Sequence, residues 1–166
     1  MIDIPLARTV LGTTALLLCA ACSADPARRE PTPAPTALAD GQPCPVTRVA
    51  ERTEAPPERA VTMADGDDSW FGGGGLWAWS PGRPVELNRE DGRLSTKWGW
   101  WRGVEGDITL AATSLRTGAS VETELDNSGY GPTGFQPSVL DFPEAGCWRF
   151  DARLGDAAIT FVAELV

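Results

Sequence analysis

The chain contains no histidine, the residue type that most often serves as an acid, base or metal ligand near neutral pH. Ser-His-Asp and Cys-His nucleophile systems, the common zinc sites and His-based copper sites all require an imidazole. The remaining chemistry would use carboxylates, arginines, the single tyrosine Tyr130 or the single lysine Lys97. We therefore expect no cofactor, no bound metal and no imidazole-based catalytic centre.

Carboxylates are plentiful, with 23 Asp and Glu residues in the chain. A pair of them could hydrolyse a glycosidic bond, but nothing in the sequence singles out one pair. The cluster Asp65-Gly66-Asp67-Asp68 offers oxygen ligands for calcium, yet the rest of a calcium-binding loop is missing, so we interpret it as a solvated turn. The run Gly72–Gly75 lacks the lysine and the following helix of a phosphate loop, and we interpret it as a flexible connection.

Tryptophans are the other residues that suggest a site. Alternation along a strand places Trp77 and Trp79 on one face, and Trp98 and Trp100 on one face with Trp101 opposite. Both faces of a sandwich strand cannot be core, so we expect at least one of these indoles to be exposed, where it could stack on a sugar ring. The alternative is that the indoles pack in the core, under the glycine-rich loop or in a protein interface. The candidate ligand-binding residues are Trp77, Trp79, Trp98, Trp100 and Trp101.

The net charge is −9, from 14 Lys and Arg against 23 Asp and Glu scattered along the chain. Such a chain repels a phosphate backbone, so we expect no nucleic-acid partner.

The C-terminal residues show the alternation of two half-buried strands. Trp148, Phe150, Ala152 and Leu154 share one face of the first strand. In the second strand, within 156–166, the residues expected on one face are Ile159, Phe161, Ala163 and Leu165. The turn Leu154-Gly155-Asp156 joins the two strands, which predicts a β-hairpin.

Further strands are expected upstream at intervals that are typical of an antiparallel sandwich. They run through Leu76–Ser80 with a partner starting at Pro84–Leu87, Leu94–Trp100 after a turn at Glu90–Gly92, Ile108–Ala112 and Val121–Leu125. No stretch keeps a helical period, so any helix is short. About seven strands in about 120 residues predict an all-β fold, an immunoglobulin-like antiparallel β-sandwich.

The N-terminus has the layout of a signal peptide: Arg8 precedes an apolar stretch, Val10–Ala21, that is too short to span a bilayer. The sequence Leu18-Cys19-Ala20-Ala21-Cys22 resembles the lipobox of bacterial lipoproteins, although Cys19 stands where leucine is usual. The resemblance implies that Cys22 is acylated and becomes the first residue of the mature chain, anchored by palmitate-type acyl chains. The alternatives are cleavage after Ala24 with release of a soluble protein, or a start codon placed slightly wrong.

These features divide the chain into three parts. We assign residues 1–21 to the lipoprotein signal peptide, 22–43 to a disordered linker rich in Pro, Ala and Thr, and 44–166 to the β-sandwich domain. The expected location is the extracytoplasmic face of the cell membrane, through the lipid anchor.

Cys44 and Cys147 are the cysteines that remain after processing. An exported protein meets an oxidising compartment, so we expect them to form a disulfide. Cys147 alternates with Trp148 and shares the outward face with Arg149 and Asp151, so the bond should lie across an edge or outer surface and not through the core.

The C-terminal half resembles a group of uncharacterised bacterial secreted and lipoprotein domains that end in F-P-x-x-G-C-W followed by a short hairpin. The matching residues are Phe142-Pro143-Glu144-Ala145-Gly146-Cys147-Trp148, together with Gly129–Ser138 and Trp98–Gly103. The resemblance covers roughly residues 70–166 and implies an exported β-sandwich. It transfers no catalytic residue.

Three functions follow as hypotheses, in order. The first is a non-enzymatic, membrane-tethered domain that binds another envelope protein or has a structural role. The second is a carbohydrate or cell-wall binding module that uses exposed tryptophans, and the third is a carboxylate-based hydrolase.

Overall fold

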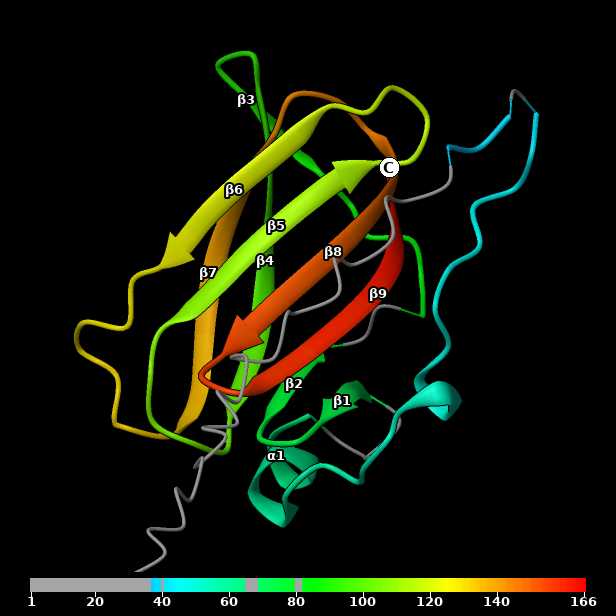
Figure 1. Ribbon diagram of the computed structural model, residues 1–166. Helices are drawn as coiled ribbons and strands as arrows, with labels where there is room; N and C mark the ends of the chain where they lie inside the picture. The colour runs from blue at the N-terminus through cyan, green and yellow to red at the C-terminus, as the bar shows by residue number, and fades with distance from the viewer. Residues whose placement is uncertain (1–36, 40, 65–68, 80–81) are drawn as a thin grey trace, which may run out of the picture. The chain divides into compact units, whose positions relative to one another are not determined.

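A computed structural model describes residues 37–39, 41–64, 69–79 and 82–166 (Figure 1). These residues belong to one compact unit, Ala34–Val166. The predicted signal peptide, Cys22, the first part of the linker and Asp65–Asp68 lie outside the described residues. Within the described part of the chain, no helix is long and apolar enough to cross a membrane.

Two antiparallel sheets pack face to face, which confirms the predicted all-β sandwich (Figure 1). The first sheet contains β1 (Trp70–Gly73), β2 (Leu76–Trp79), β3 (Asn88–Glu90), β4 (Arg93–Arg102) and β7 (Gly134–Phe142). The second sheet has the order β6 (Ser120–Leu125), β5 (Ile108–Ser114), β8 (Gly146–Leu154), β9 (Ala157–Leu165). Two short helical segments, η1 (Val49–Glu51) and α1 (Glu58–Met63), precede the strands.

The strand connections have the immunoglobulin-like pattern. Strand β4 pairs with β7 in one sheet, while β5 pairs with β6 and β8, and β8 pairs with β9, in the other. In immunoglobulin terms, β4 and β7 take the places of strands B and E, and β5, β8 and β9 those of C, F and G. The chain crosses between the sheets after β4, β6 and β7, so each sheet is built from strands that are not all consecutive in sequence.

The core between the sheets follows the predicted alternation in β8 and β9. Phe150 and Phe161 are fully buried and their rings stack with centroids 4.8 Å apart. From the facing sheet, the Trp98 ring lies 5.1 Å from Phe150. Burying each such side chain stabilises the fold by roughly 1.5–3 kcal/mol. The predicted hairpin at Leu154–Asp156 is confirmed by the pairing of Leu154 with Ala157.

A second apolar cluster covers the outer face of the first sheet. Ala60 and Ala64 of the α1 region pack against the indoles of Trp70, Trp77 and Trp101. The Trp70 Nε1–H group donates a hydrogen bond of 2.9 Å to the carbonyl oxygen of Ala60, which anchors the helix to the sheet. Strand β4 is therefore buried on both faces along its second half, because α1 acts as a third layer there.

The segment Pro84–Leu87 was expected to pair with β2, and this expectation is wrong. Val85 forms a parallel bridge with Leu165 of β9, and the Val85 and Leu87 N–H groups donate to the carbonyl oxygens of Glu164 and Val166. Both edges of β2 are already occupied by β1 and β4. The segment instead covers the edge of β9, whose backbone groups would otherwise lack partners.

Strands β1, β3 and β7 were not among the expected strands. Strand β1 is half glycine, and β3 is short and fully exposed, so neither has a readable alternation. Strand β7 contains Pro137, which is tolerated because β7 pairs only with β4 and is an edge strand.

The predicted disulfide between Cys44 and Cys147 is present, with the two Cα atoms 5.5 Å apart. Cys147 lies on the outer face of β8, as expected, yet it is only 2% exposed. The segment preceding η1 covers it: the Thr47 N–H donates to the Val162 carbonyl oxygen, and the Val162 N–H donates to the Thr47 hydroxyl. The disulfide thus fastens this N-terminal segment to the second sheet.

Contacts with the sandwich begin before Cys44, where the linker was predicted to end. The Leu38 N–H donates to the carbonyl oxygen of Leu115, and the Arg116 guanidinium donates to that of Gln42 at 2.6 Å. The end of the predicted linker is therefore hydrogen-bonded to the loop after β5.

Candidate functional site

Four of the five candidate tryptophans are buried. Trp98 and Trp100 lie in the core between the sheets, with 4% and 0% of their surface exposed. Trp77 and Trp101 lie in the outer cluster beneath α1. Trp79 is 37% exposed and is the only exposed one of the seven tryptophans, all of which the structure describes. The candidate tryptophans therefore do not form a row of exposed indoles. Of these five residues, Trp79 alone exposes a ring on which a ligand could stack.

The Trp79 ring is held firmly in place. It stacks on Trp70, with centroids 5.7 Å apart and planes inclined by 23°, and it meets Phe135 edge-on at 6.0 Å. Gly99 lies beneath both rings, and a Cβ atom there would come within 2.7 Å of Trp79 and 2.8 Å of Phe135. The glycine thus creates the space in which the exposed indole rests on the sheet.

A gap in the first sheet adjoins this indole. Strand β2 pairs with β4 only as far as Ala78 opposite Trp100, and β3 begins to pair at Asn88 opposite Ser95. Between these points, residues 96–99 of β4 have no strand partner on that edge among the described residues. The chain leaves the sheet here to reach the edge of β9 at Val85.

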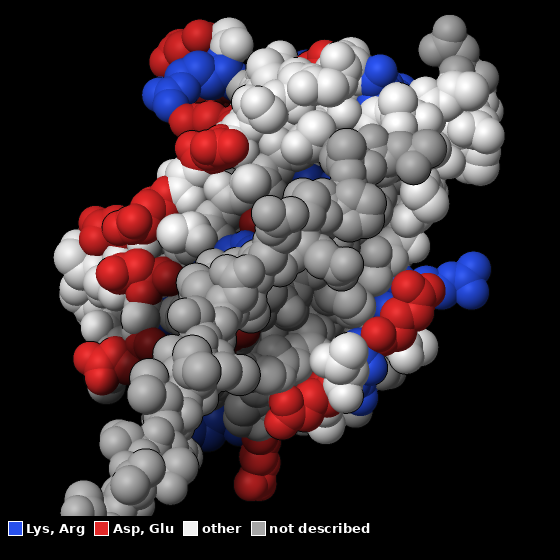
Figure 2. Space-filling model, in the orientation of Figure 1, with Lys and Arg blue, Asp and Glu red and all other residues white. Residues whose placement is uncertain are grey.

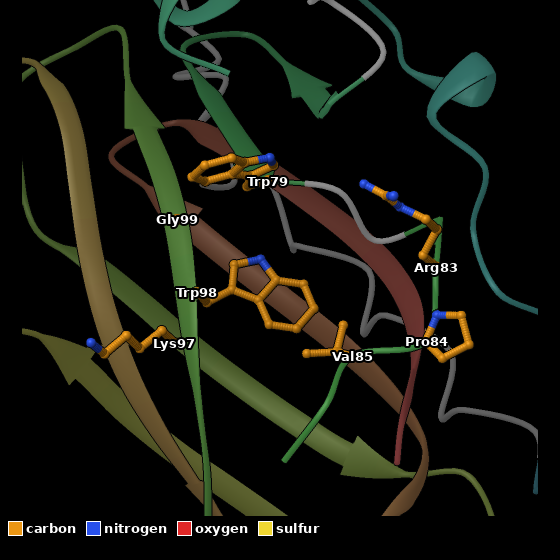
Figure 3. Close-up of a pocket in the computed structure, with 7 residues that line it drawn as sticks. All are labelled: Trp79, Arg83, Pro84, Val85, Lys97, Trp98 and Gly99. Carbon is orange, nitrogen blue, oxygen red and sulfur yellow. The ribbon is translucent and has the colours of Figure 1, made fainter. Parts of the chain in front are cut away.

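A groove of about 240 Å³ occupies this gap. Figure 3 shows its lining residues, which come from the end of β2, the segment before β3 and the middle of β4: Trp79, Arg83, Pro84, Val85, Lys97, Trp98 and Gly99. The register of three separate segments thus places an aromatic ring and two cations around one groove.

The charge of the groove is opposite to that of the whole chain. Arg83 and Lys97 are both exposed, and none of the described Asp or Glu residues lines the groove. Neither side chain has a hydrogen-bond or ion-pair partner within the described part of the chain. In a protein of net charge −9, the two cations make the lining of this groove locally basic, although Lys97 also lines a neighbouring groove together with Glu90.

A buried donor borders the same groove. The Trp98 Nε1–H group is closed off from solvent and has no hydrogen-bond partner among the described residues. Figure 3 shows this nitrogen on the ring edge that faces Trp79. A buried donor without an acceptor typically costs about 1–3 kcal/mol, so an acceptor that reached it would be held favourably.

A second groove, of about 330 Å³, lies between the free edges of β6 and β7. Tyr130, 42% exposed, lines it together with Glu124 and Asp126. Figure 2 shows acidic side chains along this side of the molecule, where β6 lies and where Glu122 and Glu124 are exposed. This groove is acidic where the first is basic.

The carboxyl group of Asp126, in this second groove, has a lowered pKa. The backbone N–H and the hydroxyl of Ser128 donate to the Asp126 carboxylate and lower its pKa below the ordinary value of 3.8. A general acid for glycoside hydrolysis needs a raised pKa, so this carboxylate does not have the property that the hydrolase hypothesis requires.

A third groove, of about 490 Å³, follows the exposed side of α1. It is lined by Glu58, Arg59, Thr62, Met63 and Trp101. Among the described residues, no group of three or more His, Cys, Asp or Glu is placed to hold a metal ion.

The sequence predicted Trp79 as a candidate site residue, and Lys97 is its single lysine. No pattern in the sequence indicated Arg83 or Gly99 as site residues. Their role depends on the register of β2, β3 and β4, which are not adjacent in sequence. The F-P-x-x-G-C-W resemblance spans the end of β7 and the start of β8, away from the groove, and stays a prediction. No family model, curated protein or solved structure matches the chain.

Proposed function

We propose that the chain is a non-enzymatic binding domain, tethered at the extracytoplasmic face of a membrane by a lipid on Cys22. Its binding site is the groove beside Trp79. The observation that carries the proposal is that the exposed indole lies in a gap of the sheet beside two cations, Arg83 and Lys97, that have no ion-pair partner among the described residues.

The rigidity of the groove supports a binding role. The Trp79 ring is fixed by Trp70 and Phe135, so a partner that packs on it does not have to immobilise a mobile side chain. The loop that carries Arg83 returns to the sheet at Val85, which is hydrogen-bonded to Glu164 of β9. A preorganised aromatic anchor flanked by charged groups is typical of recognition sites.

The lipid tether is supported by the sequence around Cys22. An acylated Cys22 would hold the chain at the membrane, and the residues before Cys44 are rich in proline, threonine and alanine. The domain would then meet partners in the envelope at high local concentration.

The test is co-sedimentation of the purified full chain, carrying Cys22→Ser to remove the lipid, with envelope fragments of the cells that produce it. We expect this chain to sediment with the fragments and the additional change Trp79→Ala to reduce the bound fraction by about tenfold. The matched control is Tyr130→Ala, which removes an exposed aromatic ring from the other groove and should leave sedimentation unchanged.

Two outcomes would contradict the proposal. If the lipid-free chain stays in solution, the domain has no envelope partner. If Trp79→Ala sediments as well as the parent chain while its melting temperature is unchanged, the groove is not the binding site.

A further inference from the structure

We infer that the groove beside Trp79 binds an anionic glycan, a chain of sugar rings that carries at least two carboxylate or phosphate groups. This inference rests on the proposed function and names the class of ligand. It follows from the aromatic platform, from the two cations and from their positions on either side of β4.

The aromatic platform favours a sugar ring. The Trp79 ring stacks on Trp70, and the residue keeps 37% of its surface exposed. The apolar C–H face of a pyranose ring packs on such a surface, while its hydroxyl groups stay in water. A flat anion without an apolar face would leave the indole unused.

The cations select for negative charge. The Arg83 guanidinium and the Lys97 ammonium have no carboxylate partner among the described residues, and the groove lining contains none. A guanidinium binds carboxylate or phosphate oxygens with two parallel hydrogen bonds, and an ammonium binds them as a point charge. Because both side chains are exposed, a ligand can bind them at the surface, and neither cation is buried before the ligand binds.

The separation of the cations indicates a polymer. Figure 3 shows Lys97 leaving β4 on the opposite side from Trp98, whereas Arg83 lies across the groove and extends towards Trp79. Lys97 also faces Val139 of β7 on the outer surface of the sheet. Because the two side chains point in different directions, we expect a glycan that lies across Trp79, with one anionic group at each cation, to engage both of them better than a single small anion does.

The size of the groove is consistent with this arrangement. Its volume of about 240 Å³ is below the range of roughly 300–1,000 Å³ that encloses a drug-sized ligand. We therefore expect it to hold one sugar unit while neighbouring units lie on the surface. Near this sugar unit, the Trp98 Nε1–H group has no hydrogen-bond acceptor among the described residues. Because this group is buried, a neighbouring side chain has to move before a ligand oxygen can accept its hydrogen bond.

The experiment measures binding of the full chain with Cys22→Ser to three probes by isothermal titration calorimetry. The probes are polygalacturonate, which carries carboxylates; the same polymer fully methyl-esterified, which is neutral; and a polysaccharide whose units are joined by phosphodiesters. We expect binding to one or both charged polymers and none to the ester. We also expect affinity to fall by about tenfold or more as ionic strength rises from roughly 0.05 to 0.5 M, because salt screens exposed charges.

Variants locate the site. Trp79→Ala should weaken binding by about tenfold, and Arg83→Gln and Lys97→Gln by roughly threefold to tenfold each, with a shallower salt dependence. The matched controls are Arg153→Gln, an exposed cation of the opposite sheet, and Tyr130→Ala; both should bind as the parent chain does. Melting temperatures establish that every variant is folded.

The outcomes separate this inference from the proposed function. Equal binding of the neutral ester, or unchanged binding by the two cation variants, would overturn the anionic ligand but leave envelope binding through Trp79 intact. Failure of both charged polymers to bind would also overturn it, whatever the envelope assay shows. Preference for the carboxylate or the phosphodiester polymer identifies the source of the charge.

Discussion

At the scale of single residues, two buried polar side chains, Arg102 and Gln136, donate hydrogen bonds to backbone carbonyl groups at one end of the sandwich. Arg102 is 1% exposed and donates from Nη1 to the Gly106 carbonyl oxygen at 3.1 Å and from Nη2 to that of Gly131. Gln136, fully buried, donates to the Asp126 carbonyl oxygen at 3.0 Å. These side chains satisfy loop carbonyl groups at one end of the sandwich, whereas the groove residues Arg83 and Lys97 satisfy none among the described residues.

Gly99→Ala tests whether the glycine holds the site together. The new methyl group would come within 2.8 Å of ring carbons of Trp79 and Phe135, so one of these rings has to move. We expect a loss of roughly 1–3 kcal/mol in the free energy of unfolding and stronger quenching of Trp79 fluorescence by acrylamide. Urea unfolding and quenching measurements on the variant check both effects, with Trp79→Phe used to assign the Trp79 signal.

The control for this change is Gly131→Ala. A Cβ atom at Gly131 would meet its nearest atom, the Thr133 carbonyl oxygen, at 3.4 Å, and its backbone does not need a positive φ. This variant should unfold like the parent chain. If Gly99→Ala does so too, the rings are free to move and the site is not preorganised.

At the scale of elements, the sandwich is completed by segments that are not regular strands. Helix α1 covers the outer face of the first sheet, and the segments around Thr47 and Val85 cover the edge of β9. The segments around Thr47 and Val85 supply hydrogen-bond partners to backbone groups at the edge of β9, whereas α1 is joined to the sheet through the Trp70 indole. The groove exists because the chain between β2 and β3 is diverted to this edge.

Removing the disulfide should destabilise the domain. The bond joins residues separated by 103 positions, and closing a loop of about 100 residues is worth up to about 4–5 kcal/mol in the chain-entropy model. We expect the double variant Cys44→Ala/Cys147→Ala to unfold at a markedly lower urea concentration than the oxidised parent. The reduced parent serves as the comparison, and midpoints that coincide for all three would show that the cross-link does not contribute to stability.

At the scale of the whole molecule, we propose a lipid-anchored chain whose binding domain has a net negative charge and a basic groove beside Trp79. A chain of net charge −9 is repelled by most acidic polymers at long range. Binding of an anionic glycan then depends on short-range contacts at Trp79, Arg83 and Lys97, and a tether that raises local concentration compensates for a modest affinity.

Cys22→Ala tests the tether in the producing cells. We expect the wild-type chain in the membrane fraction and the variant in the soluble fraction or as an uncleaved precursor, because the acylated residue is missing. Cys19→Ala is the matched control and should stay with the membrane. A lipoprotein signal peptidase inhibitor should leave the wild-type precursor uncleaved, and normal cleavage under the inhibitor would contradict lipidation of Cys22.

Local spacing in the sequence determined the class of fold and much of its core. The alternation from Trp148 to Leu165 fixed which side chains face inward, because successive residues of a strand point to opposite faces whatever their partner strand is. The same rule separated Trp101 from Trp98 and Trp100. The pairing of Cys44 with Cys147 followed from the count of cysteines outside the predicted signal peptide and its lipidation site.

The tertiary structure alone decided which tryptophan is exposed and what lies beside it. Trp77 and Trp79 share a face of β2, but α1 covers the first and leaves the second open. The groove forms because β2 stops pairing with β4 at Ala78 and because the segment Pro84–Leu87 pairs with β9 and not with β2. In each case, segments that are distant in sequence could pair with the same strand edge. A local pattern of residues does not determine which of them does so.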